Sequence, residues 1–262
     1  MKTLLICHEE DDLDREGLAK WLGSFSDLVG IVILCDTKGQ VWRRIRREFK
    51  RVGVLRFLDV LAFRIYYAFF LAKKDQEWKK KKLEELSRRY PPLRKDLSVL
   101  YTHSPNSAEA EEFIERLHPD IALARCKFIL RERIFRIARK GTFVLHPGIC
   151  PEYRNAHGCF WALANRDLEK VGMTLLRIDA GVDTGPVYGY YTYPYNELNE
   201  SHLVIQHRTV LDNLVPLQNK FMEIYGGSAN PIDTSARKST TWGQPWLSRY
   251  LQWKSEARKK LR

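Results

Sequence analysis

The chain has 262 residues, of which 44% are hydrophobic and 29% are charged, with 15 glycines and 11 prolines. This composition is typical of a globular protein with a sizeable core, and it excludes a disordered, collagenous or low-complexity chain. The formal net charge of +12 points to an anionic partner, such as a phosphorylated substrate, an acidic lipid or a nucleic acid.

Nearly all of the excess charge lies in residues 41–96, which hold 18 lysines and arginines against 7 acidic residues. Within this basic segment, residues 52–72 are apolar and aromatic but include Arg56, Asp59 and Arg64, whose charges disfavour a membrane-spanning helix. Two interpretations stay open for this stretch. It packs in the core or on the second subunit of a homodimer, which we favour, or it lies as an amphipathic helix on a membrane surface with its basic flanks at the headgroups.

Apolar runs of strand length alternate with helical patterns along the chain. The predicted strands are residues 3–7, 31–35, 98–101, 120–124 and 142–145, and the predicted helices are residues 18–25, 107–117, with Ser107 as the cap, and 129–138. This order predicts an α/β fold with a Rossmann-like, doubly wound, mostly parallel sheet, whose ligands bind beyond the carboxyl ends of the strands. After it we expect a helical segment over residues 201–224 and an extended tail.

The cysteines indicate the compartment. There are five of them at irregular spacing, which is typical of reduced thiols rather than of a disulfide framework. The apolar run at the N-terminus is too short for a signal peptide. We therefore expect a cytoplasmic protein, with attachment to the inner face of a membrane through residues 41–96 as the alternative location.

Two residues suggest acid–base chemistry. His146 ends a predicted strand, and Asp183 lies in a glycine-flanked loop after a later strand. A histidine and a carboxylate in one cleft form a general acid–base pair. The alternative is that His146 only caps a strand and Asp183 only forms a turn. Metal binding is not expected, because the histidines and cysteines between residues 146 and 159 match no common zinc spacing.

The segment around these residues resembles a known family. The matching positions are His146-Pro147, Pro151, Tyr153-Arg154, Gly172-Met173-Thr174 and Asp179-Ala180-Gly181-Val182-Asp183-Thr184-Gly185. They are similar to the formyltransferases that use formyltetrahydrofolate, which include glycinamide ribonucleotide, methionyl-tRNA and sugar N-formyltransferases. The resemblance implies a catalytic domain over residues 1–205, with residues 41–96 as a basic helical insertion, and a helical extension and tail over residues 206–262.

The resemblance also implies an activity, which is transfer of a formyl group from the cosubstrate formyltetrahydrofolate to a primary amine of a small acceptor, a sugar or another metabolite. His146 would bind the developing oxyanion and handle protons, and Asp183 would orient water and relay the proton of the amine. Arg154 would order the loop beside them. The implied pterin contacts are Phe128, Leu130, Asp179, Ala180, Gly181 and Val182.

Two positions depart from the family pattern, and one of them is Asn155, which stands where the family has a glycine. Where the family has a catalytic asparagine, two residues before the histidine, this chain has Val144, which cannot donate a hydrogen bond. Loss of one such donor costs other enzymes about 100-fold to 1000-fold in rate. Asn155 and His157 are candidate substitute donors. The alternative function is a catalytically impaired, formyltransferase-like binding protein.

A third interpretation is an RNA-linked, formyltransferase-like protein, which would use the basic segment to bind RNA. We do not expect a nucleic acid partner. The segment after Gly226 is too short for the separate barrel domain that the resemblance to methionyl-tRNA formyltransferases would require.

Overall fold

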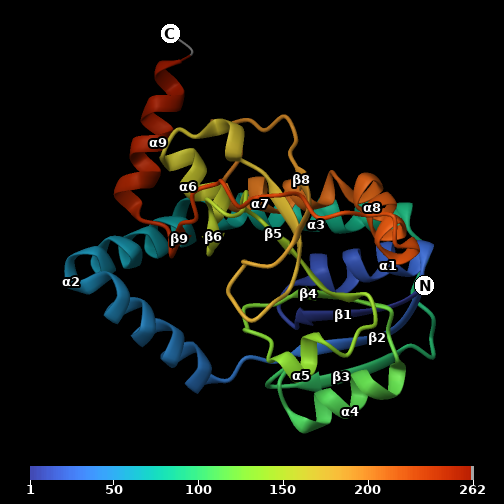
Figure 1. The fold of residues 1–262 in the computed structure, drawn as a ribbon. Helices are drawn as coiled ribbons and strands as arrows, with labels where there is room; N and C mark the ends of the chain where they lie inside the picture. Colours follow the sequence, from blue (N-terminus) through green and yellow to red (C-terminus); the bar gives the residue numbers. More distant parts are fainter. Residues whose placement is uncertain (261–262) are drawn as a thin grey trace.

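A computed structural model describes residues 1–260, and its centre is a seven-stranded sheet (Figure 1). The strands are β1 (Lys2–His8), β2 (Asp27–Leu34), β3 (Ser98–Thr102), β4 (Ile121–Arg125), β5 (Gly141–His146), β7 (Met173–Arg177) and β8 (Val187–Tyr191). Their order is β3-β2-β1-β4-β5-β7-β8. The first five pair in parallel, whereas β7 is antiparallel to both of its neighbours. The predicted Rossmann-like α/β class is confirmed.

Helices cover both faces of the sheet because successive strand side chains point to opposite sides. In β1, Leu5 belongs to one apolar cluster and Leu4 to another. The first face is covered by α1 (Ala19–Phe25), α3 (Ala72–Arg89), α7 (His202–Leu211) and α8 (Leu214–Gly226). The second face carries α4 (Ala108–Leu117) and α5 (Glu132–Phe135) (Figure 1). A single π-helical turn, η1 (Leu13–Leu18), precedes α1.

The prediction of a helix over residues 129–138 is wrong for most of its length, because only Glu132–Phe135 are α-helical. Asn106 explains the difference. Its side chain accepts a hydrogen bond from the Arg131 amide (2.7 Å) and donates one to the Ile129 carbonyl (3.0 Å). These bonds replace the helical ones and leave residues 126–130 as a loop at the carboxyl end of β4. The Ser107 cap is present, and its hydroxyl accepts from the Ala110 amide at 3.2 Å.

The C-terminal part of the chain differs from the expected extended tail. It contains β9 (Thr241–Trp242) and the helix α9 (Leu247–Lys259). Tyr250 and Trp253 of α9 are buried in an apolar cluster with α6 (Gly158–Ala164). β9 pairs with β6 (Arg154–Asn155), and η2 (Leu168–Lys170) follows α6. The tail is therefore an ordered part of the fold from β9 to Lys259.

The expected helix over residues 201–224 is divided between α7 and α8. The amide group of Asn213 lies at the break and donates to the carbonyls of Thr209 (2.9 Å) and Thr192 (3.0 Å). Leu217 of α8 is buried in the same cluster as Leu5 of β1, so α8 is packed directly on the sheet. The division of the chain at residue 205 stays a prediction.

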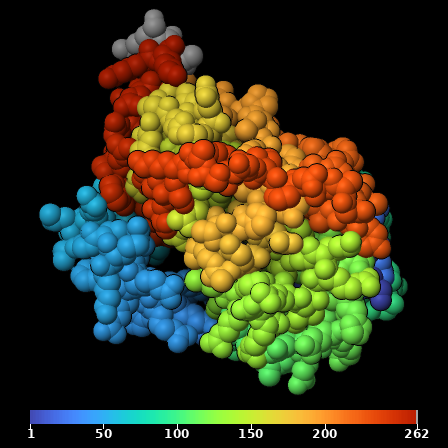
Figure 2. All heavy atoms as spheres, in the orientation of Figure 1, coloured from blue at the N-terminus to red at the C-terminus, as the bar shows by residue number. Residues whose placement is uncertain are grey.

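The basic insertion forms α2 (Lys38–Phe70) and α3 between β2 and β3. The Thr37 and Gln40 side chains make a capping box at the start of α2, and Gly53, with a φ of +76°, kinks it. The two halves of α2 form an arm that projects from the body (Figures 1 and 2). Within residues 1–260, no helix combines the length and the apolar character needed to cross a membrane.

Candidate active site

His146 is the last residue of β5, and its imidazole is buried at the carboxyl edge of the sheet. Its Nε2 lies 2.7 Å from the carbonyl oxygen of Tyr153, so Nε2 carries a proton and donates it there. Gly148 leaves room for this hydrogen bond, because it has no Cβ. A Cβ at that position would lie 2.6 Å from the Tyr153 oxygen and 2.9 Å from Nε2. The tight loop after β5 thus fixes the orientation of the ring.

Asp183 faces the other ring nitrogen of His146. It lies in the loop between β7 and β8 with a φ of +52°, a left-handed conformation that is strained for a residue with a Cβ. Its Oδ2 accepts a hydrogen bond from the Asn155 amide (2.8 Å) and lies 3.4 Å from Nδ1 of His146. Arg154 holds the same loop, because its Nη1 donates to the Val182 carbonyl at 2.9 Å. The strand β6 therefore positions the carboxylate.

The surroundings of His146 favour its protonated form. Burial lowers the pKa of His146, but the Asp183 carboxylate, Cys150 and the Tyr153 carbonyl outweigh it and raise that pKa to about 10. His146 is therefore a buried imidazolium at neutral pH. Such a group is a strong hydrogen-bond donor and stabilises nearby negative charge.

A pocket lies beside this pair, between the end of β4, β5 and the β7–β8 loop. Five of the six predicted pterin contacts line it, together with Asp183, and Ala180 lies exposed in the same loop. Of the other lining residues, the sequence singled out Val144, whereas the apolar Leu176 and Ile178 carry no polar signature and were not found. The complete lining is Ala124, Cys126, Phe128, Ile129, Leu130, Val144, Leu176, Ile178, Asp179, Gly181, Val182 and Asp183.

The two candidate substitute donors make other interactions. The Asn155 side chain donates to the Trp242 carbonyl, while its backbone amide holds Asp183. His157 lies with its ring centre 5.8 Å from that of His202. Burial lowers the pKa of His157 to about 4, so this imidazole is neutral at physiological pH. Neither side chain hydrogen-bonds to the His146–Asp183 pair within the described residues 1–260.

Comparison with known proteins identifies the family. Residues 70–205, just over half of the chain, match the family model described as formyl transferase. The chain belongs to the formyl transferase family. This confirms the resemblance drawn from the motifs around His146 and Asp183.

Individual relatives differ in the acceptor that their names state. A methionyl-tRNA formyltransferase from Dehalococcoides mccartyi (strain CBDB1) is 35% identical over 97 residues, which span 37% of this chain and 31% of that protein. A phosphoribosylglycinamide formyltransferase from Anaplasma phagocytophilum has a TM-score of 0.56 at 11% identity, over 94% of this chain and 99% of that one. A sugar 3N-formyl transferase, WlaRD, has a TM-score of 0.50 at 13% identity, over 92% of this chain and 69% of that one. The two structures share the fold.

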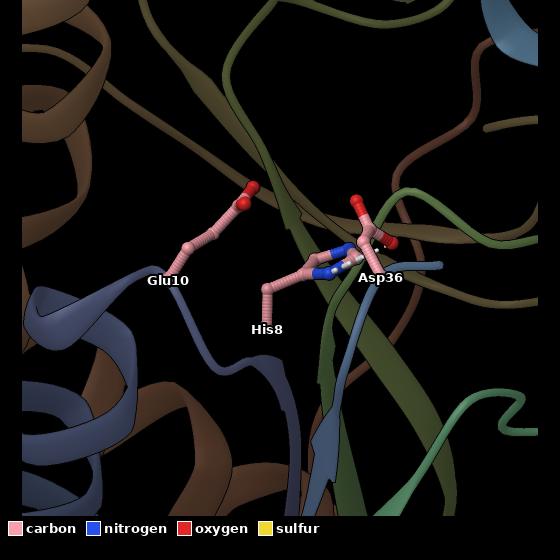
Figure 3. Close-up of side chains that lie close together, drawn as sticks. All are labelled: His8, Glu10 and Asp36. Carbon is pink, nitrogen blue, oxygen red and sulfur yellow. Dashed lines mark ion pairs between the residues drawn. The ribbon is translucent and has the colours of Figure 1, made fainter. Parts of the chain in front are cut away.

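A second polar cluster of this formyl transferase lies at the ends of β1 and β2. Figure 3 shows His8, Glu10 and Asp36 close together, with His8 Nδ1 3.8 Å from Asp36 Oδ1. The backbone amide of Lys127 donates to His8 Nε2 (3.0 Å), so the proton of the neutral ring is on Nδ1. Neither ring nitrogen then has a free lone pair for a metal ion. The two carboxylates of the cluster instead form ion pairs with neighbouring cations, Asp36 with Arg44 of α2 and Glu10 with Lys127.

A buried ion pair supports the end of β5 and was not predicted. Arg125 at the end of β4 donates to Asp14 at 3.1 Å and to the Leu145 carbonyl at 2.5 Å. Burial, partly offset by the Arg125 charge, raises the pKa of Asp14 to about 7. The two residues are far apart in sequence, so no local pattern could indicate their pairing. Arg125 fixes the strand immediately before His146.

Proposed function

We propose that this formyl transferase moves a formyl group from formyltetrahydrofolate to a primary amine on a small acceptor, a sugar or another metabolite. The observation that supports this best is the pair of the buried His146 and the partly buried Asp183, with 3.4 Å between Nδ1 and Oδ2, beside the pocket. WlaRD, whose structure was determined in the presence of dTDP and 5-N-formyl-THF, supports both the cosubstrate and the sugar acceptor.

The pocket suits a flat heteroaromatic ring with polar edges. Ala124, Val144 and Leu176 give it apolar walls, and the loop of residues 179–183 gives it a polar rim. We assign the binding of the pterin to the two loops that line the pocket. The residues are Phe128, Leu130, Asp179, Ala180, Gly181 and Val182. When bound, formyltetrahydrofolate supplies the activated formyl group.

The two charged groups have complementary roles in this proposal. An amine attacks a carbonyl carbon only as the free base, so a proton has to leave it, and negative charge develops on the formyl oxygen. His146, as an imidazolium, donates a hydrogen bond to that oxygen through its Nδ1–H, because its Nε2–H is held by the Tyr153 carbonyl. Asp183 would accept the proton from the amine, directly or through one water molecule, and pass it to the nitrogen of tetrahydrofolate, which leaves as its bond to the formyl carbon breaks. Asn155 and Arg154 are positioning residues, because they contact the Asp183 loop.

Val144 makes stabilisation of the oxyanion depend more strongly on His146. An apolar side chain in the pocket contributes no donor, so the oxyanion depends on the charged imidazolium, whose hydrogen bonds are about twice as strong as neutral ones. Val144 is also the observation that favours the second candidate function, a catalytically impaired protein that binds folate without turnover.

The experiment is a formylation assay with formyltetrahydrofolate and a panel of amines, including amino-sugar nucleotides and methionyl-tRNA, with mass spectrometry of the products. Folate binding is measured in parallel by calorimetry. We expect a formylated small molecule, which His146→Gln and Asp183→Asn abolish without loss of folate binding. Folate binding without any product would favour the impaired protein. Absence of folate binding would contradict both functions, and formylated tRNA would contradict the small acceptor.

A further inference from the structure

The second half of α2 has an apolar face that is exposed on the surface of the described chain. Val54, Leu58, Leu61, Ile65 and Phe69 recur every three or four residues, so they share one side of the helix. All are exposed, and Phe69 is 81% exposed. This outer stripe therefore lies on the surface of residues 1–260 without a partner.

The opposite side of the same half-helix explains why α2 is held to the body. Val60 and Phe63 are buried, and the Phe63 ring lies 5.2 Å from that of Tyr250 on α9. The side of α2 that packs on the body is thus the one opposite the outer stripe. The apolar residues of the stripe are additional to those that the fold uses.

The first half of α2 carries a cluster of exposed cations beside an apolar side. Arg43, Arg46, Arg47 and Lys50 fall on one side of this half, and an apolar side with Trp42, which is 70% exposed, lies next to it. The four cations are exposed and have no ion-pair partner within residues 1–260.

Contact across the kink joins the two halves. The rings of Phe49 and Phe57 meet edge to face with their centres 5.3 Å apart. The apolar side of the first half therefore lies close to the second half at the bend, and the arm acts as one unit.

The charges on α2 are strongly one-sided. The helix has nine lysines and arginines against two acidic residues. Both acids are already used: Glu48 pairs with Arg51 at 2.6 Å, and Asp59 accepts a hydrogen bond from the Ser248 amide at 3.0 Å. The arm therefore presents positive charge around an exposed apolar stripe, with no free carboxylate on the helix to repel an anionic surface.

We propose that α2 is a docking arm for anionic lipid bilayers, with the outer stripe at the boundary between headgroups and acyl chains and the cations on the headgroups. Interfacial helices combine these two features. A second copy of the chain is disfavoured as the partner, because the two cationic arms would repel each other. RNA is disfavoured because its phosphates would pair with the cations but leave the apolar stripe exposed to water. The arm also projects from the body, which leaves room for a bilayer (Figures 1 and 2).

The test is flotation of the full chain with vesicles of phosphatidylcholine, with and without phosphatidylglycerol. The first variant is Leu58→Glu/Ile65→Glu in the outer stripe. Its matched control is Val215→Glu/Met222→Glu, which places the same charges on exposed apolar residues of α8, on the far side of the molecule (Figure 1). We expect binding to the anionic vesicles that weakens with salt. The arm variant should lower the partition coefficient by about tenfold or more, and the control should leave it unchanged.

A second variant protects the test against a folding defect. Arg46→Gln/Lys50→Gln changes only exposed cations and should weaken binding by about fivefold for each charge near the surface. Thermal unfolding establishes that each variant is folded.

Failure of the wild-type chain to float with phosphatidylglycerol vesicles at low salt overturns the proposal, as does equal binding by the arm variant and the control. A dimer in sedimentation velocity that Leu58→Glu/Ile65→Glu dissociates, without vesicle binding, would assign the stripe to a second copy. These readouts need no formyl transfer, so they are independent of the proposed function.

Discussion

The charge on His146 depends on one carboxylate, and Asp183→Asn tests this. The substitution keeps the size of the side chain and the acceptor oxygen but removes the negative charge 3.4 Å from Nδ1. At an effective dielectric constant of about 20, a pair at that separation interacts by about 5 kcal/mol. The rise in the pKa of His146 from 6.5 to about 10 corresponds to a similar free energy, about 5 kcal/mol. In Asp183→Asn, burial acts unopposed by that charge, and we expect the pKa of His146 to fall below 6.5.

The assay is an NMR titration of histidine ring carbons, with the His146 signal assigned from a His146→Gln variant. Asp179→Asn is the matched control. This carboxylate lies in the same loop but accepts hydrogen bonds from the Gly181 amide (3.0 Å) and the Thr184 hydroxyl (2.7 Å). Asp179→Asn should therefore leave the titration of His146 unchanged. A wild-type His146 that titrates near 6.5, or one that stays charged above pH 9 in Asp183→Asn, would refute the electrostatic reasoning.

The same pair makes stability depend on pH. Because the pKa of His146 is higher in the folded than in the unfolded chain, folding is favoured by proton binding. That stabilisation is present in full below the unfolded value of 6.5 and is lost as the pH rises to about 10. The free energy of unfolding of the wild-type chain should therefore fall across this range relative to that of His146→Gln, and a flat difference would contradict the assignment.

Three further substitutions probe the site and the tail. Val144→Asn restores an amide donor to the pocket and should raise kcat by about tenfold or more in the formylation assay; unchanged kcat would mean that the donor is not limiting. Gly148→Ala places a Cβ 2.6 Å from the Tyr153 carbonyl oxygen, so we expect a lower Tm and weaker folate binding, and an unaltered protein in both measurements would contradict the tight loop. Trp253→Ala removes a fully buried side chain of α9 and should cost about 3–5 kcal/mol in urea unfolding. A cost below about 1 kcal/mol would show that α9 is not part of the cooperative fold.

The five parallel strands of the sheet, though not the antiparallel β8, could be predicted from the sequence because their signals are local. Each strand is a short apolar run followed by a turn or helix signal, and the order of the runs determines a parallel sheet. Among the site residues, spacing alone placed His146 at a strand end but could not bring Asp183 to it. That pairing came from the family resemblance. The Asn155 amide, which holds Asp183 in the structure, had no signal of its own, because a backbone donor is present at every residue except proline.

The C-terminal contacts could not be predicted for a different reason. β6 and β9 are two residues long, and the Asn155 side chain that donates to the Trp242 carbonyl lies 87 positions from it in sequence. A pairing so short and so distant produces no periodic pattern. Residues 52–72 were hard to interpret because they have too many apolar positions, which lie on both sides of α2. Periodicity therefore could not say which side packs, and only the contact of Phe63 with Tyr250 in the structure decides it.

The docking arm and the candidate active site are joined by consecutive contacts. Arg44 of α2 pairs with Asp36 at the end of β2, and Asp36 faces His8 at 3.8 Å. The His8 ring stacks on Phe128 with ring centres 5.9 Å apart, and Phe128 lines the pocket. These contacts fix the position of the pocket relative to the arm. If α2 lies on an anionic bilayer, the pocket is therefore held near the lipid surface, where a membrane-borne acceptor would be concentrated.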